Sequence, residues 1–153
     1  MKTIQSFTVD HDFIDPGMYI SRIDGDITTY DMRTRKPNAS DYMDNLTMHS
    51  LEHMFATYIR NSAIGESVIY FGPMGCRTGF YLLVRDVDKN VVLKETKKAL
   101  EDIVSHSGKM FGAERKQCGN FRGLSLKAAQ TEAKRFLDVL NNTITDFEYK
   151  AVL

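Results

Sequence analysis

The sequence predicts an α+β fold: a single domain over residues 1–153, in which a mainly antiparallel β-sheet packs against about three to four α-helices. The predicted elements run strands, helix, strands, helix, helix. This order contains few alternating strand–helix–strand units, which favours an antiparallel sheet over a doubly wound parallel one. With 153 residues, 42% hydrophobic and 26% charged, and no internal repeat, the chain also has the size and composition of one globular domain.

The first forty residues predict a β-hairpin. Residues 18–23 and 27–32 are rich in β-branched and aromatic side chains, which favour strands. Asp24-Gly25-Asp26 between them predicts a tight turn, because glycine adopts positive φ without steric cost. Residues 36–43 are then expected to form a loop.

A first helix is predicted to begin at Asp44 or Asn45, since either side chain can cap free backbone N–H groups, and to end between residues 61 and 65. Its inner face has apolar side chains at helical spacing: Leu46, Leu51, Met54, Phe55 and Ile59. Two strands follow at residues 68–71 and 80–84. The connection between them, residues 72–79, holds three glycines and a proline, which predicts a loop of defined shape.

The second half of the chain predicts two more helices, over residues 88–105 and about 125–141, with Ser125 as a cap of the latter. Residues 107–123 between them are expected to form a loop with a short extended piece leading to Cys118. The tail, residues 145–153, alternates loosely and is expected to form a strand or a docked last turn.

Charge and composition exclude several classes of function. Twenty basic and twenty acidic residues cancel, so the chain has no excess of positive charge with which to bind nucleic acid or an anionic membrane. No apolar run approaches the ~18 residues needed to span a bilayer, and the N-terminus lacks a signal-peptide pattern. We therefore expect a cytoplasmic protein. Its two cysteines are too few for a disulfide scaffold and are expected to serve chemistry.

A metal site is suggested by residues 49–53, HSLEH, within the first predicted helix. At 3.6 residues per turn, His53 lies about 40° from His49 around the helix axis, and Glu52 about 60° to the other side. Both imidazoles can then bind one divalent ion while the carboxylate points into the same site. The alternative is an exposed polar helix face on which these residues fall by chance.

Two histidines leave a metal short of ligands, since catalytic sites usually have three protein ligands and one open position. The candidates for the third are Cys118, Cys76, His11, His106 or an acidic residue. Cys118 precedes Gly119, which allows close approach, and a His2Cys site suits Zn²⁺ or Fe²⁺. The alternative for Cys118 is a small buried side chain.

Cys76 lies in the glycine-rich connection and precedes Arg77. A cationic neighbour and free loop N–H groups stabilise a thiolate, which is the reactive form of cysteine. Cys76 is therefore a candidate nucleophile or acid/base group, and the alternative is simple packing.

Together these motifs resemble the S-ribosylhomocysteine lyase (LuxS) family. The resemblance covers nearly the whole chain in order, and residues 72–79 are its most specific part. It rests on the following runs: 6–11 (SFTVDH), 30–33 (YDMR), 49–53 (HSLEH), 72–81 (GPMGCRTGFY) and 117–120 (QCGN), with a looser match over 124–133. Many members have an acidic residue where this chain has Tyr70, and a histidine where it has Leu124.

The resemblance implies a carbon–sulfur lyase that cleaves S-ribosylhomocysteine to homocysteine and 4,5-dihydroxy-2,3-pentanedione, a quorum-sensing precursor. It implies metal ligands at His49, His53 and Cys118, and acid/base groups at Glu52 and Cys76. It also implies that three further residues bind the ribose part of the substrate: Ser6, His11 and Arg33. The family also implies one divalent ion per subunit, Fe²⁺ with Zn²⁺ or Co²⁺ as substitutes, and a homodimer with active sites at the interface.

Two other functions fit the residues taken alone. H-x-x-E-H also occurs in inverted-zincin metallohydrolases, where the glutamate activates a metal-bound water. A non-enzymatic metal or redox module is the other possibility, and it predicts a site closed by a fourth protein ligand such as Cys76.

Overall fold

A four-stranded antiparallel sheet in the order β1-β2-β4-β3 forms one layer of the molecule. The computed structural model describes residues 1–153. The strands are β1 (Gly17–Asp24), β2 (Ile27–Arg33), β3 (Val68–Pro73) and β4 (Gly79–Arg85). All strand pairs are antiparallel, as predicted, and Gly25 occupies the β1–β2 turn with φ of 63°.

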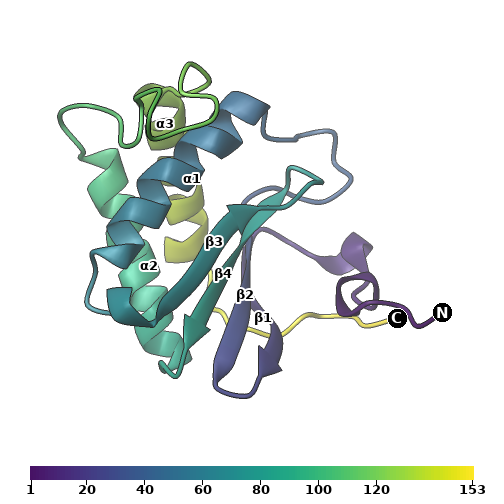
Figure 1. The fold of residues 1–153 in the computed structure, drawn as a ribbon. Helices are drawn as coiled ribbons and strands as arrows, with labels where there is room; N and C mark the ends of the chain where they lie inside the picture. Colours follow the sequence, from purple (N-terminus) through teal and green to yellow (C-terminus); the bar gives the residue numbers. More distant parts are fainter.

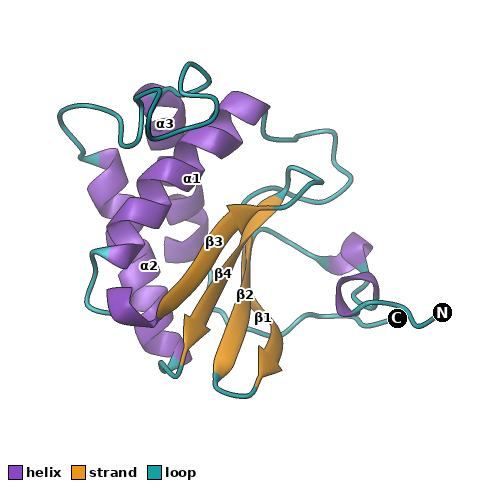
Figure 2. Ribbon diagram, viewed as in Figure 1, coloured by secondary structure: helices purple, strands orange, loops and turns teal.

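Three helices form the second layer and cover one face of the sheet (Figures 1 and 2). They are α1 (Asn45–Arg60), α2 (Lys89–Val104) and α3 (Leu126–Asn141). Their starts agree with the sequence, because the side chain of Asp44 accepts a hydrogen bond from the Thr47 N–H and that of Ser125 from the Ala128 N–H. The α+β prediction is confirmed, with three α-helices.

The core lies between these two layers. Side chains of paired strand residues share a face, so Phe71 and its partner Leu82 point into the core while Tyr70 and its partner Leu83 lie on the opposite face. The predicted inner face of α1 is buried with one exception: Leu46 is exposed.

Two details of the sequence expectations are wrong. Residues 107–123 form a loop, as expected, but it contains no extended piece before Cys118. The glycines and polar residues of this stretch close local turns, such as the Cys118 N–H to Glu114 carbonyl bond, instead of pairing with a strand. Residues 145–153 form neither a strand nor a helical turn, because the tail bonds first to β1 and then to residues 8–10, and never follows one strand long enough to pair with it.

The tail nevertheless docks on the body of the molecule. The Ile20 N–H donates to the Phe147 carbonyl, Thr145 Oγ1 donates to the Met18 carbonyl, and a single β-bridge joins Val9 to Val152. Figure 1 shows the tail crossing β1 on its way to the N-terminal segment. No helix combines the length and apolar character that crossing a membrane requires.

Candidate active site

The predicted histidine pair lies on one face of α1 and meets Cys118 from the α2–α3 loop. The two imidazole rings have centroids 4.6 Å apart, and Cys118 Sγ lies 3.3 Å from His49 Nε2. One donor atom from each of these three residues falls within 4.8 Å of the others. The structure thus brings together a His/His/Cys group that could hold a metal ion, and neither Cys76, His11 nor His106 belongs to it.

Backbone carbonyls orient both histidines. His49 Nδ1 lies 2.8 Å from the Gly123 carbonyl oxygen, and His53 Nδ1 lies 3.0 Å from that of Phe111. A carbonyl only accepts, so each Nδ1 carries a proton and donates it. The lone pair of each neutral ring is then on Nε2, the state and orientation that a metal ligand needs. The donor chemistry of this group fits a divalent ion.

The loop that carries Cys118 approaches α1 closely. Gly112 has φ of 66°, and a Cβ at this position would lie 2.7 Å from His53 Nδ1. The Asn120 N–H donates to Cys118 Sγ at 3.3 Å, which favours a thiolate. His106, one of the candidate ligands, instead bonds through Nδ1 to the Tyr58 hydroxyl and through Nε2 to the Lys109 carbonyl.

Glu52 lies on α1 between the two histidines and is partly exposed. Its carboxylate forms no hydrogen bond or ion pair with another side chain or with the backbone. The carboxylate of Glu52 is therefore unpaired within the chain.

Cys76 is exposed at the tip of the β3–β4 hairpin. Arg77 next to it adopts φ of 64°, which turns the chain back so that Thr78 Oγ1 lies 3.0 Å from Cys76 Sγ. The guanidinium of Arg33, from β2, lies 3.9 Å from the same sulfur. A cation at this distance favours the thiolate.

Arg33 and Asp31, both on β2, form a buried ion pair next to the tip of this hairpin. Arg33 Nη2 and Nε donate to the two carboxylate oxygens at 2.6 and 3.1 Å, and both side chains are almost fully buried. Burial lowers the pKa of Arg33, but Asp31 outweighs it, so the net pKa is raised and the cation persists. Burial, together with Asp31, also raises the pKa of Tyr81 on β4.

Ser6 and His11 lie elsewhere in the chain. They belong to the short 3-10 helices Gln5–Phe7 and His11–Phe13, next to β1 at one edge of the sheet, whereas α1 packs on β3 at the other edge. His11 Nδ1 bonds to the Val9 carbonyl at 2.9 Å. Within one chain, neither residue forms a hydrogen bond with the His/His/Cys group or with Cys76.

Sequence reasoning missed Asp31 and Thr78, which hold Arg33 beside Cys76. Asp31 and Arg33 are separated by one residue in a strand, and that spacing alone places them on one face. Thr78 follows Cys76 by two residues, but its role depends on the turn at Arg77, for which the sequence has no local signal.

Comparisons with known proteins agree on one family. A family model described as S-Ribosylhomocysteinase (LuxS) matches residues 4–147. A curated S-ribosylhomocysteine lyase from Borreliella burgdorferi (strain ZS7) is 40% identical over 148 residues, covering 93% of this chain and 94% of its own. Proteins of the same name from Finegoldia magna and Clostridium acetobutylicum are 41% and 40% identical, covering 93–95% of this chain and 94–96% of their own.

Proposed function

Because this chain belongs to the S-ribosylhomocysteinase (LuxS) family, we propose that it cleaves the thioether of S-ribosylhomocysteine at the site described above. It is a carbon–sulfur lyase that releases homocysteine and 4,5-dihydroxy-2,3-pentanedione, the quorum-sensing precursor. The observation that supports this most is the convergence of the donor atoms of His49, His53 and Cys118 within 4.8 Å.

The chemistry requires proton transfers before the carbon–sulfur bond can break. The sulfur is on C5 of the sugar, so elimination needs a ketone at C3, which makes the C4 proton acidic. The carbonyl must therefore move from C1 to C2 and from C2 to C3, each time through an enediolate. A divalent ion held by the three ligands would act as a Lewis acid toward this negative charge.

Glu52 and Cys76 move the protons. Each carbonyl migration takes a proton from one sugar carbon and returns one to the neighbouring carbon. A carboxylate and a thiolate can each accept such a proton as a base and give it back as the conjugate acid. In the last step a base removes the C4 proton, the C4–C5 double bond forms, and homocysteine leaves with the electrons of the broken C5–S bond and takes up a proton. The enol that remains at C4 and C5 then tautomerises to the second ketone of the dione. Arg33 supports this assignment, because its guanidinium lies 3.9 Å from Cys76 Sγ.

Ser6, His11 and Arg33 bind the ribose part of the substrate, and the protein is a homodimer whose active sites lie at the interface. Two observations support this. Ser6 and His11 lie at the opposite sheet edge from α1 within one chain, so a second copy is needed to bring them to the metal site. The sheet face away from the helices also exposes an aromatic side chain, that of Tyr70, which is 50% exposed.

The metal is Fe²⁺, one ion per subunit, with Zn²⁺ or Co²⁺ able to replace it. Two imidazoles and one thiolate suit each of these ions. Residues 1–153 act as one catalytic domain in the cytoplasm, where thiols remain reduced. Oxidation of Cys76 or Cys118 would remove an acid/base group or a ligand.

Anaerobic purification with metal analysis, followed by a thiol-release assay on S-ribosylhomocysteine, tests the proposal. Cys118→Ala is expected to lose both metal and turnover, because it removes a ligand.

Cys76→Ala should keep its metal and lose turnover. Glu52→Gln should likewise lose turnover while keeping its fold. Near-normal homocysteine release by Cys76→Ala would contradict the acid/base assignment.

A further inference from the structure

Thr78 lies between a cation and the reactive sulfur. Its side-chain oxygen accepts a hydrogen bond from Arg33 Nη1 at 2.9 Å and lies 3.0 Å from Cys76 Sγ. Thr78 is 2% exposed, so bulk water has little access to its hydroxyl.

The donors and acceptors around Thr78 determine where its proton points. Arg33 has only donors, so the threonine oxygen accepts from it and cannot direct its own hydrogen there. The one remaining partner within hydrogen-bond distance is Cys76 Sγ. A buried hydroxyl hydrogen without a partner is costly, so the O–H donates to the sulfur, and it does so most strongly when the sulfur is a thiolate.

The same chain of contacts continues away from the sulfur to the C-terminal tail. The Tyr149 hydroxyl donates to Asp31 Oδ2 at 2.7 Å, the oxygen that also accepts from Arg33 Nη2. Asp31 is 1% exposed, and burial raises the pKa of Tyr149, so this phenol remains a neutral donor. Tyr149 thus completes the contacts that orient Asp31, and through it Arg33.

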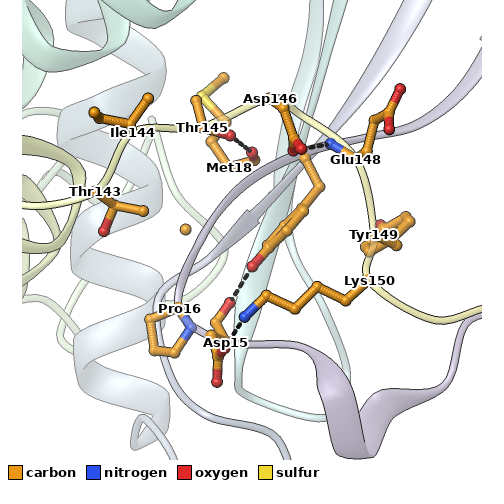
Figure 3. Close-up of a pocket in the computed structure, with 12 residues that line it drawn as sticks. Asp15, Pro16, Met18, Thr143, Ile144, Thr145, Asp146, Glu148, Tyr149 and Lys150 are labelled. Carbon is orange, nitrogen blue, oxygen red and sulfur yellow. Dashed lines mark hydrogen bonds and ion pairs between the residues drawn. The ribbon is translucent and has the colours of Figure 1, made fainter.

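The tail holds Tyr149 in place by contacts on both sides of it. Figure 3 shows Thr145 bonded to Met18 and Lys150 paired with Asp15. These residues line a cavity of about 590 Å³. The Tyr149 ring stacks on Tyr19 of β1, with ring centroids 5.0 Å apart and planes 12° apart. These contacts hold the Tyr149 ring in place, although it belongs to a segment with no regular secondary structure that lies far from Cys76 along the chain.

We propose that Thr78 stabilises the thiolate of Cys76 by direct hydrogen bonding, and that Tyr149 of the C-terminal tail is a positioning residue that acts on the same thiolate through Asp31 and Arg33. This deepens the proposed function, since it rests on Cys76 acting as an acid/base group. The titratable and charged groups around the sulfur are Arg77 next to it in the hairpin tip, Arg33 and Asp31 from β2, and Tyr81 from β4. Tyr149 from the tail joins them through Asp31.

The test is the rate at which iodoacetamide alkylates Cys76 in the metal-loaded protein, measured against pH. Only the thiolate reacts, and mass spectrometry of the Cys76 peptide separates it from Cys118. Thr78→Val should shift the midpoint of the rate profile upward by about one pH unit, so that alkylation below the midpoint slows roughly tenfold. Thr78→Ser, which keeps the hydroxyl, should restore the profile.

Tyr149→Phe should shift the midpoint in the same direction by a smaller amount, because Tyr149 acts through two intervening residues. Alkylation of Cys76 below the midpoint should then slow about threefold. Tyr19→Phe is the matched control. It loses a hydroxyl that bonds only to the Asp15 backbone, keeps the stacked ring, and should leave the profile unchanged.

An unchanged profile in folded Thr78→Val, or in Tyr149→Phe, would overturn the proposal. If Thr78→Val does not fold, the Tyr149→Phe profile decides. Alkylation does not require turnover, so these outcomes are independent of the thiol-release assay that tests the function itself.

Discussion

Backbone groups, more than side chains, orient the candidate metal ligands. The carbonyls of Gly123 and Phe111 accept from the two histidines, and the Asn120 N–H donates to Cys118. The loop must therefore approach α1 within van der Waals distance. Gly112 makes this approach possible, because any side chain there would meet the His53 ring.

Gly112→Ala is expected to weaken metal binding by about tenfold or more, the usual effect of disturbing a group that orients a ligand. The new Cβ would lie 2.7 Å from His53 Nδ1, at a backbone φ of 66° that side chains rarely adopt. Competition with a chelator measures the affinity. Gly119→Ala is the control, because it is next to Cys118 but has no atom within 4 Å of its added Cβ and no positive φ. Equal affinity in the two variants would refute this reading.

At the scale of elements, α1 is the central support of the site, since it carries both histidines and Glu52. Its first turn is held by Asp44, whose side chain accepts from the Thr47 N–H at 2.7 Å. Hydrogen bonds from the Thr47 side chain and backbone lower the pKa of Asp44. The cap is therefore formed by the carboxylate, and its contribution depends on pH.

Asp44→Ala should lower the free energy of unfolding by about 1 kcal/mol, the typical value of a lost N-cap. Because the pKa of Asp44 is lower in the folded than in the unfolded state, the carboxylate's contribution is complete above its unfolded pKa, about 3.9, and is lost as the pH falls through the folded value. Urea unfolding at pH 7 and near pH 3 measures both effects. Asp44→Asn, which retains a hydrogen-bond acceptor, should lose less unfolding free energy at pH 7 than Asp44→Ala does. If the difference in unfolding free energy between Asp44→Ala and wild type does not shrink near pH 3, the cap is not formed by the carboxylate.

At the scale of the whole molecule, the two faces of the sheet differ. The helices cover one face, whereas Tyr70 and Leu83 lie on the other, and Ser6 and His11 lie beyond its β1 edge. A symmetric pair of chains would cover this open face and bring the N-terminal segment of one subunit to the metal site of the other.

Co-expression of two inactive variants tests whether the sites are shared between subunits. His11→Ala and Cys118→Ala alter different parts of a shared site, so a mixed dimer regains one intact site, and roughly a quarter of all sites should become active. His11→Ala with Ser6→Ala is the matched control, since both changes lie in the same N-terminal segment and no mixed site is intact. Absence of activity in the first pair would show that each chain builds its site alone.

Local features of the sequence determined much of the fold and part of the site. Both hairpins, the three helices and the caps at Asp44 and Ser125 depend on neighbours within a few residues, and the sequence predicts them. The pairing of His49 with His53 is of the same kind, because the helical repeat places residues four apart on one face.

Only the tertiary structure decided which residues meet across the chain. Cys118 reaches His49 over 69 positions, and Arg33 reaches Cys76 over 43. The residues taken alone left several candidates for the third ligand, of which only the family resemblance selected Cys118, and they assigned no role to Asp31, Thr78 or Tyr149. The reason is physical: contacts between distant residues depend on how helices pack on the sheet and how loops close, and no local preference specifies either.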